Sequence, residues 1–180
     1  MVTTFIPSAA VTRDFFEFLV AGHALGHRGF HGKDHWLRVL LNGRRLAAET
    51  GANLHVVELF ALLHDSCRES ENHDPDHGRR AAVYAHDLRG TWFNATNAEM
   101  DLLTLTCELH SDGHTEADIT VQTCWDADRL DLGRVGIRPS ARYLCTEVAR
   151  RGDVIAAAYG RSTSSATSLA SSSVTSSVRR

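Results

Sequence analysis

The stretch NLHVVELFALLHDSCRE, residues 53–69, decides the fold because it contains a helical segment that is apolar on nearly every side. Asn53 belongs to the residue types that cap helix N-termini, and the hydrophobic run that follows it continues to Leu63. A surface helix keeps one polar face, so a helix that is apolar all round must be shielded by other elements. We therefore predict that residues 54–63 form the central helix of the domain, with His64 and Asp65 extending it.

Helical patterns lie on both sides of this stretch. Upstream, Thr12 is placed to cap a helix that ends in the glycine-rich segment 22–32, and a second helix follows it and stops at Gly51. Thr96 and Glu99 have the spacing of a capping box. Downstream helices are predicted over about 77–88, from Thr96 to His110, around residues 125–128, and from near Pro139 through Val148. The expected fold class is all-α, a single bundle of about six to seven helices.

The C-terminal segment has a different composition. Of residues 161–180, 12 are Ser or Thr and few are apolar. Such a segment cannot bury enough surface to offset the entropy lost on ordering. We expect one folded domain over residues 1–160 and a disordered Ser/Thr-rich tail over 161–180.

Composition and charge limit the classes of partner. The net charge of −3 provides no field for general nucleic-acid binding, so a small-molecule partner is expected. The chain has no apolar run of 18 residues and no secretory signal near Met1, which favours a cytoplasmic protein without a membrane span. The four cysteines form no CxxC pair and are expected to be reduced thiols. The oligomeric state stays open, with a homodimer among the alternatives.

Four side chains with metal-binding chemistry recur along the predicted helices: His35, the doublet His64-Asp65, and Asp128. Imidazole nitrogens and carboxylate oxygens that converge from several helices hold a divalent cation. Asp65 follows an apolar run, where an unpaired carboxylate would be costly without a cation or a strong hydrogen-bond donor. The alternatives are that each histidine is structural and that Asp128 forms an ordinary ion pair with Arg129 or Arg134.

These residues also carry a family resemblance. His35 in HGKDHWLRV, the doublet in LFALLHDSCRE and Asp128 in DADRLD resemble the His, His-Asp, Asp pattern of the HD superfamily of metal-dependent phosphohydrolases, over about residues 30–150. The resemblance implies an all-α HD domain in which these four residues bind one divalent ion.

His77 and His110 look like the additional histidines that some HD proteins use for a second metal bridged by the doublet aspartate. Alternatively, His77 only begins a helix and His110 interacts with a helix C-terminus. Asp126 and Asp131, which flank Asp128, are either groups that support the ligands or solvated charges.

The activity that the resemblance implies is hydrolysis of a phosphate ester, a nucleotide or another small phosphate, by metal-activated water. Mn, Co, Ni, Zn, Mg and Fe all fit the ligand set. Asp65 is expected to orient the water, and His77 or His110 to contact phosphate or protonate the leaving group. The basic residues expected to bind substrate are Lys33, Arg38 and Arg68.

Two other functions remain open at this point. The six positions that include His77 and His110 also resemble those of HD-fold proteins that hold two irons and oxidise substrates with dioxygen. A metal-stabilised binding module without turnover is the third alternative. After His110 the chain reads SDGHT, without the Gly-Tyr-Pro of HD enzymes that cleave cyclic dinucleotides, so that substrate class is disfavoured.

Overall fold

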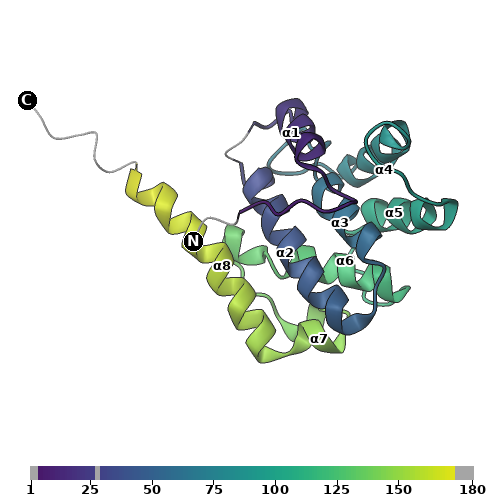
Figure 1. Cartoon of the computed structure of the whole chain (residues 1–180). Coiled ribbons are helices and arrows are strands. Elements are labelled where there is room, and N and C mark those ends of the chain that lie inside the picture. Colours follow the sequence, from purple (N-terminus) through teal and green to yellow (C-terminus); the bar gives the residue numbers. More distant parts are fainter. Residues whose placement is uncertain (1–3, 27–28, 173–180) are drawn as a thin grey trace, which may run out of the picture.

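The computed structural model describes residues 4–26 and 29–172, with side chains up to residue 164. This part of the chain forms eight α-helices and two short 3₁₀ helices and contains no strand, which confirms the predicted all-α fold (Figure 1). The elements are α1 (Arg13–Gly22), α2 (Lys33–Thr50), α3 (Leu54–Leu63), α4 (His77–Leu88), α5 (Asn97–Leu109), α6 (Ile119–Arg129), η1 (Leu132–Val135), η2 (Ala141–Tyr143), α7 (Glu147–Arg150) and α8 (Gly152–Ser172).

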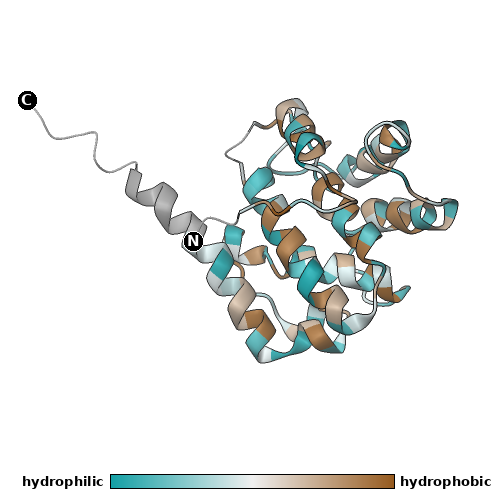
Figure 2. Cartoon of the chain, viewed as in Figure 1, coloured by the Kyte–Doolittle hydropathy of each residue, from teal (hydrophilic) through white to brown (hydrophobic). Residues whose placement is uncertain are grey.

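Helix α3 lies at the centre of the bundle. Every residue from Val56 to Leu63 is buried, and α3 packs against α2, α4, α5 and α6. The hydropathy colouring shows the same helix as a brown segment enclosed by its neighbours (Figure 2). The prediction of a central helix is therefore confirmed. His64 and Asp65 lie in the turn directly after α3 instead of continuing the helix.

Local capping chemistry explains where several helices begin and end. The Thr12 hydroxyl accepts the backbone N–H of Phe15 at the start of α1, and the Asn53 side chain accepts two backbone N–H groups at the start of α3. Thr96 and Glu99 form the predicted capping box of α5. Gly51 ends α2 with φ of 74°, a left-handed conformation that glycine adopts without a steric penalty.

The prediction of one helix from near Pro139 through Val148 is wrong. The chain instead forms the short helices η2 and α7, separated by extended backbone at Leu144. The cause is tertiary: the buried carboxylate of Asp126 accepts the backbone N–H of Cys145 at 2.6 Å and that of Thr146 at 2.8 Å. These bonds hold the backbone extended, and Thr146 then caps α7.

Helix α8 differs from the prediction of disorder beyond residue 160, because it continues to Ser172 (Figure 1). The Arg161 guanidinium donates to Asn42 Oδ1 at 2.7 Å, and Ser162 is buried beside Gly133 of η1. Ala158 and Ile155, about one and two turns earlier, are buried apolar residues of the same helix. Residues 173–180 lie outside the described part of the chain.

Within the described residues, no helix combines the length and the apolar character that crossing a bilayer requires. The four cysteines are all free thiols, as predicted. Burial raises the pKa of the Cys145 thiol to about 12. These thiols pack as small hydrophobic side chains.

Candidate metal centre

The six side chains predicted as metal ligands meet in one buried site, and helix ends supply nearly all of them. They are His35 in the first turn of α2, His64 and Asp65 directly after α3, His77 at the start of α4, His110 directly after α5, and Asp128 in the last turn of α6. Five of these side chains are almost fully shielded, and that of Asp128 is 16% exposed. The site therefore opens to solvent on the side of Asp128.

One group of donor atoms surrounds the Nε2 atom of His35. This atom lies 3.1 Å from Nε2 of His64 and 3.3 Å from Oδ1 of Asp128. Asp65 Oδ2 lies 3.4 Å from His35 Nε2 and 3.5 Å from His64 Nε2. Two imidazoles and two carboxylates thus direct one ligand atom each toward a common point.

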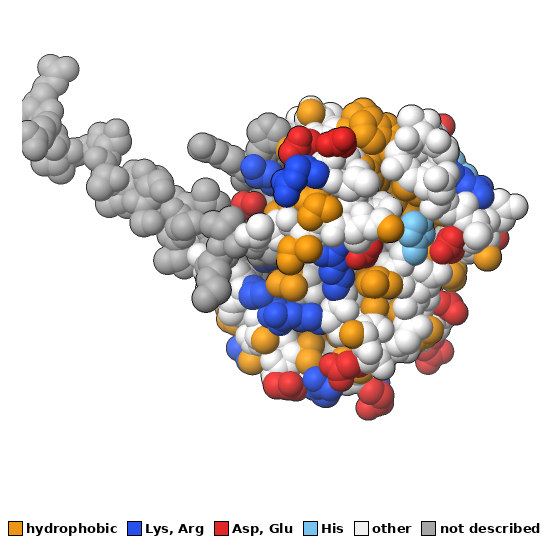
Figure 3. Space-filling model, viewed as in Figure 1, with side chains coloured by type: hydrophobic (Ala, Val, Ile, Leu, Met, Phe, Trp, Pro, Cys, Tyr) orange, Lys and Arg blue, Asp and Glu red, His pale blue; other side chains and the backbone are white. Residues whose placement is uncertain are grey.

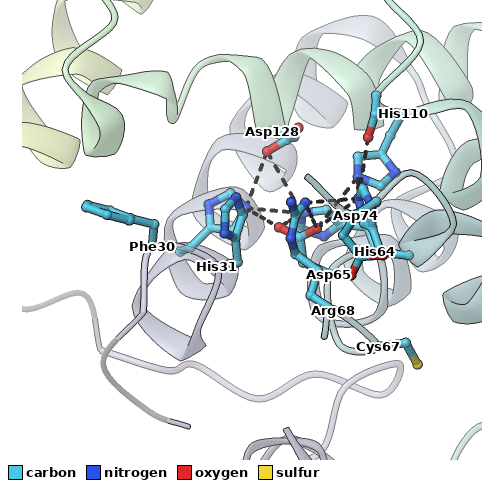
Figure 4. A network of polar contacts seen from close by, with 12 residues as sticks. Phe30, His31, His64, Asp65, Cys67, Arg68, Asp74, His110 and Asp128 are labelled. Atoms are coloured by element: carbon cyan, nitrogen blue, oxygen red, sulfur yellow. Dashed lines mark hydrogen bonds and ion pairs between the residues drawn. The ribbon is translucent and has the colours of Figure 1, made fainter. Parts of the chain in front are cut away.

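A second group of donor atoms lies on the other side of Asp65. The Nε2 atoms of His77 and His110 are 2.9 Å apart, and Asp65 Oδ1 lies 3.3 Å and 3.7 Å from them. The two oxygens of Asp65 therefore face different pairs of histidines. Figure 4 shows the network of polar contacts around the labelled Asp65. This arrangement places the doublet aspartate as a bridge between two neighbouring donor sets.

All four imidazoles are held in the orientation that metal ligation needs. His35 Nδ1 lies 2.7 Å from Asp131 Oδ2, and the other three Nδ1 atoms face backbone carbonyl oxygens, those of Phe60, Asp74 and Cys107. A ring that donates from Nδ1 presents the Nε2 lone pair on its opposite edge. The Nε2 atoms of all four rings consequently converge on the interior of the site, and each would present a lone pair when its ring is neutral.

The donor set fits a divalent cation. Ligand atoms at about 2.1 Å from a cation lie about 3 Å from one another when they subtend a right angle. The observed spacings of 2.9–3.3 Å between His35 and His64, His35 and Asp128, and His77 and His110 or Asp65 are close to this value. In addition, Asp128 Oδ1 is a buried acceptor without a hydrogen-bond partner among the described residues. A cation would satisfy it.

Electrostatics keep the carboxylates ionised although they are buried. Burial alone would raise the pKa of Asp65, but the adjacent His64 and hydrogen bonds from His110, His35 and His77 outweigh it and hold the pKa well below its usual range. The pKa of Asp128 is also lowered, with burial opposed by His35 and Arg134. Burial lowers the pKa of His64 to about 3, so this ring is a neutral donor. The centre thus combines ionised oxygens with a neutral imidazole.

His35 carries a proton when no cation compensates the acids. Burial and the Arg134 charge oppose protonation, but Asp128, Asp131 and Asp65 together raise the pKa of His35 to about 9. The local excess of negative charge attracts a positive one, and a bound divalent ion would replace this proton.

The two acids that flank Asp128 have different roles. Asp131 is 1% exposed and joins His35 Nδ1 to Arg38, whose Nε and Nη2 donate to it at 2.6 Å and 3.0 Å. It therefore fixes the orientation of the His35 ring. Asp126 instead accepts hydrogen bonds from the backbone before α7 and from the Thr146 hydroxyl.

The basic residues predicted to bind substrate lie near the site but differ in how they are engaged. Arg68 Nη1 lies 3.4 Å from Asp65 Oδ1 and 3.2 Å from His77 Nε2, at the second donor set. Lys33 is half-buried at the start of α2 and forms no ion pair with the described residues. Arg38 is buried, and its guanidinium is bound to Asp131.

The alternative of an ordinary ion pair at Asp128 can be judged from its neighbours. Arg129 turns away and donates to the carbonyl oxygens of Tyr143 and His114. Arg134 Nη1 lies 3.8 Å from Asp128 Oδ1, too far for a hydrogen bond. This Nη1 atom is itself buried without a hydrogen-bond partner in the described part of the chain. Neither arginine thus forms a hydrogen-bonded ion pair with Asp128.

Sequence reasoning missed a histidine at the edge of the site. His31 is buried, its ring centre lies 6.2 Å from that of His35, and its Nδ1 lies 2.6 Å from Glu71 Oε2 (Figure 4). The signal was its position four residues before His35. His86 and His114 are exposed, and His27 lies outside the described residues.

A protein-family comparison agrees with this geometry. The family model described as HD domain matches residues 32–133, more than half of the 180-residue chain. The match includes all six residues of the candidate metal centre. Neither the comparison with curated proteins nor that with solved structures gave a match. The chain therefore belongs to the HD-domain family and is a member of the HD superfamily.

Proposed function

We propose that this protein is a metal-dependent phosphohydrolase that acts on a nucleotide or another small phosphate ester. The observation that carries the proposal is the position of Asp65, whose two oxygens face two separate sets of imidazole Nε2 atoms. Such a bridging carboxylate is suited to two cations held close together. We propose His35, His64, Asp65 and Asp128 as ligands of one ion, and His77, His110 and Asp65 as ligands of the other.

Divalent cations bound there would supply a Lewis acid that activates water and polarises a phosphoryl oxygen. The protein's own contribution is to hold the donor atoms rigidly, through four bonded Nδ1 atoms, and to exclude bulk water. Asp65, which faces both donor sets, is placed to orient the attacking water.

His77 and His110 were expected either to bind metal or to contact the phosphate and leaving group. Their engaged Nδ1 atoms and the 2.9 Å separation of their Nε2 atoms favour the ligand role.

Guanidinium groups at two edges of the site support a phosphate substrate over an uncharged one. Arg68 lies beside Asp65 Oδ1, and Arg134 has a buried Nη1 without a hydrogen-bond partner among the described residues. Because Asp128 and Arg134 lie on the side that opens to solvent, we propose that Arg134 contacts the phosphate as it enters. Lys33, at the start of α2, would add charge at longer range.

Arg38 has a different role in this proposal. Its two hydrogen bonds to Asp131 leave it turned toward a carboxylate that orients His35, so Arg38 acts as a positioning residue. Substrate contact is assigned to Arg68, Arg134 and Lys33.

A phosphate-release assay tests the proposed activity. The full chain, supplied with Mn²⁺, Co²⁺ or Ni²⁺, is incubated with nucleoside monophosphates and other small phosphate esters. Release by the wild type and its loss in Asp65→Asn are expected. In Arg68→Met, KM for the cleaved ester rises about tenfold or more, because a charge-assisted hydrogen bond is lost. Arg79→Met is the matched control, since Arg79 is exposed and pairs with the exposed Asp76.

The other two functions predict different results. Two irons per chain with iron-dependent oxygen consumption and no phosphate release would favour the oxygenase. Tight binding of a phosphate ester without product under every metal would favour the non-catalytic module. An unchanged KM in Arg68→Met would remove Arg68 from the substrate site.

A further inference from the structure

A cavity lies away from the metal centre, between α2, α7 and α8. Its volume is about 380 Å³, which falls within the range of small-molecule sites. Leu46, Leu130, Val148 and Val154 line it with apolar side chains. Basic side chains lie beside hydrophobic ones on the face between α2 and α8 (Figure 3). The cavity thus offers an apolar floor and charged walls.

The charges in this cavity are not balanced locally. The two acids of the wall, Glu49 and Asp153, both pair with Arg151 at the rim, at 2.5 Å and 3.5 Å. Arg45 and Arg161 form no ion pair with any described residue, although both line the cavity. Two guanidinium groups therefore share one cavity without a carboxylate partner.

Arg161 also has an unsatisfied donor. Its Nη2 donates to Asn42 Oδ1 at 2.7 Å, but its Nε is buried and has no hydrogen-bond partner in the described part of the chain. Burial and the nearby charge of Arg45 lower the pKa of the Arg161 guanidinium. A buried donor without an acceptor costs free energy, and an anionic oxygen at this point would remove that cost.

We propose that this cavity is a second binding site, for a small oxyanion, a phosphate or a carboxylate, that carries an apolar body. The anionic group binds Arg161 and Arg45, and the apolar body lies on the floor formed by Leu46, Leu130, Val148 and Val154. Guanidinium groups recognise both kinds of oxyanion through paired N–H donors. The site uses none of the six proposed metal ligands, so it does not depend on the phosphohydrolase activity.

Calorimetric titration of the metal-loaded full chain with phenylphosphonate, benzoate and inorganic phosphate tests the proposal. Phenylphosphonate or benzoate is expected to bind more tightly than inorganic phosphate, because only the first two have an apolar ring. Comparing these two aromatic probes separates a phosphate-type ligand from a carboxylate-type one.

Four variants locate the binding. Arg161→Met should weaken it about tenfold or more by removing a charged donor. Ala157→Leu should weaken it similarly by filling the cavity from an exposed position of α8, and it remains informative if Arg161→Met unfolds. Arg142→Met removes the same charge from an exposed site elsewhere, and Asp65→Asn alters the metal centre. Neither change should alter the affinity of the aromatic probes for this cavity.

The proposal is overturned if no aromatic probe binds more tightly than inorganic phosphate, or if Asp65→Asn abolishes all binding. It is also overturned if Arg161→Met and Ala157→Leu retain wild-type affinity. Concentration-dependent dimerisation that Ala157→Leu disrupts, without probe binding, would instead assign this face to a second copy of the chain.

Discussion

Replacing Asp131 by asparagine tests whether the metal centre depends on a residue that is not itself a ligand. Asp131 lies 2.7 Å from His35 Nδ1 through one oxygen, and the same carboxylate accepts two hydrogen bonds from Arg38. An amide of the same shape keeps an oxygen acceptor but loses the charge. His35 then loses its fixed ring orientation and part of its basicity as a ligand.

The expected loss of metal affinity is 10- to 100-fold, the range typical of groups that orient a ligating histidine. In free energy this is about 1.4–2.7 kcal/mol. The chain also loses stability, because Arg38 is 5% exposed and its charge would be left without a compensating carboxylate. Affinity must therefore be measured at a temperature where the variant is folded.

A competitive titration of Mn²⁺ or Zn²⁺ against a fluorescent chelator gives the affinity, and circular dichroism gives the folded fraction. Asp126→Asn is the matched control, because Asp126 is equally buried and flanks Asp128 from the other side, yet binds only the segment before α7. It should lower Tm and leave metal affinity unchanged. Equal affinities in wild type and Asp131→Asn, or equal losses in both variants, would refute the reasoning.

Three further changes have defined outcomes. Gly78→Ala should lower both Tm and metal affinity, because the added Cβ would collide with the carbonyl oxygen of Cys107 where α4 meets α5. The control Gly160→Ala, which has open space around the new Cβ, should not lower Tm. Equal effects of the two substitutions would contradict this reasoning. The capping hydrogen bonds from Thr96 lower the pKa of Glu99. The ionised Glu99 side chain therefore stabilises the fold at pH values above its unfolded pKa of about 4.3, and this stabilisation is lost as the pH falls through the lower pKa of the folded state. Glu99→Gln should therefore lower Tm at pH 7 but not at pH 2.5, and a pH-independent difference would argue against the cap. Removal of the metal by EDTA should reduce the free energy of unfolding. Compared with protein in which the free metal concentration is a thousand times the Kd, the reduction should be about 4 kcal/mol. An unchanged Tm after chelation would contradict a metal centre.

The structure could be predicted from the sequence where it depends on contacts between residues close together in the chain. Helices α1 to α6 follow apolar periodicity and capping residues such as Thr12 and Asn53, which act within a few positions along the chain. That the candidate side chains meet was also predictable, because Asp65, two residues after the apolar run that ends at Leu63, needs a partner where it is buried.

Features that depend on distant contacts could not be predicted. The break at Leu144 results from hydrogen bonds to Asp126, which is 18 residues away, and no local pattern encodes it. Similarly, Asp131 and Arg38 meet across more than 90 residues, and His31 reaches Glu71 across 40. The helical start of the serine-rich segment follows from burial of Ser162 against η1, which composition does not reveal.

The central claim is that Asp65 joins two sets of histidine donors into one divalent-metal centre. Elemental analysis of the purified full chain after loading with Mn²⁺ or Zn²⁺ and desalting, wild type beside Asp65→Asn, tests it most directly. We predict close to two ions per chain in the wild type and fewer than one in the variant, with both proteins folded. Equal metal content in the two proteins would contradict the assignment of Asp65 and the centre built around it.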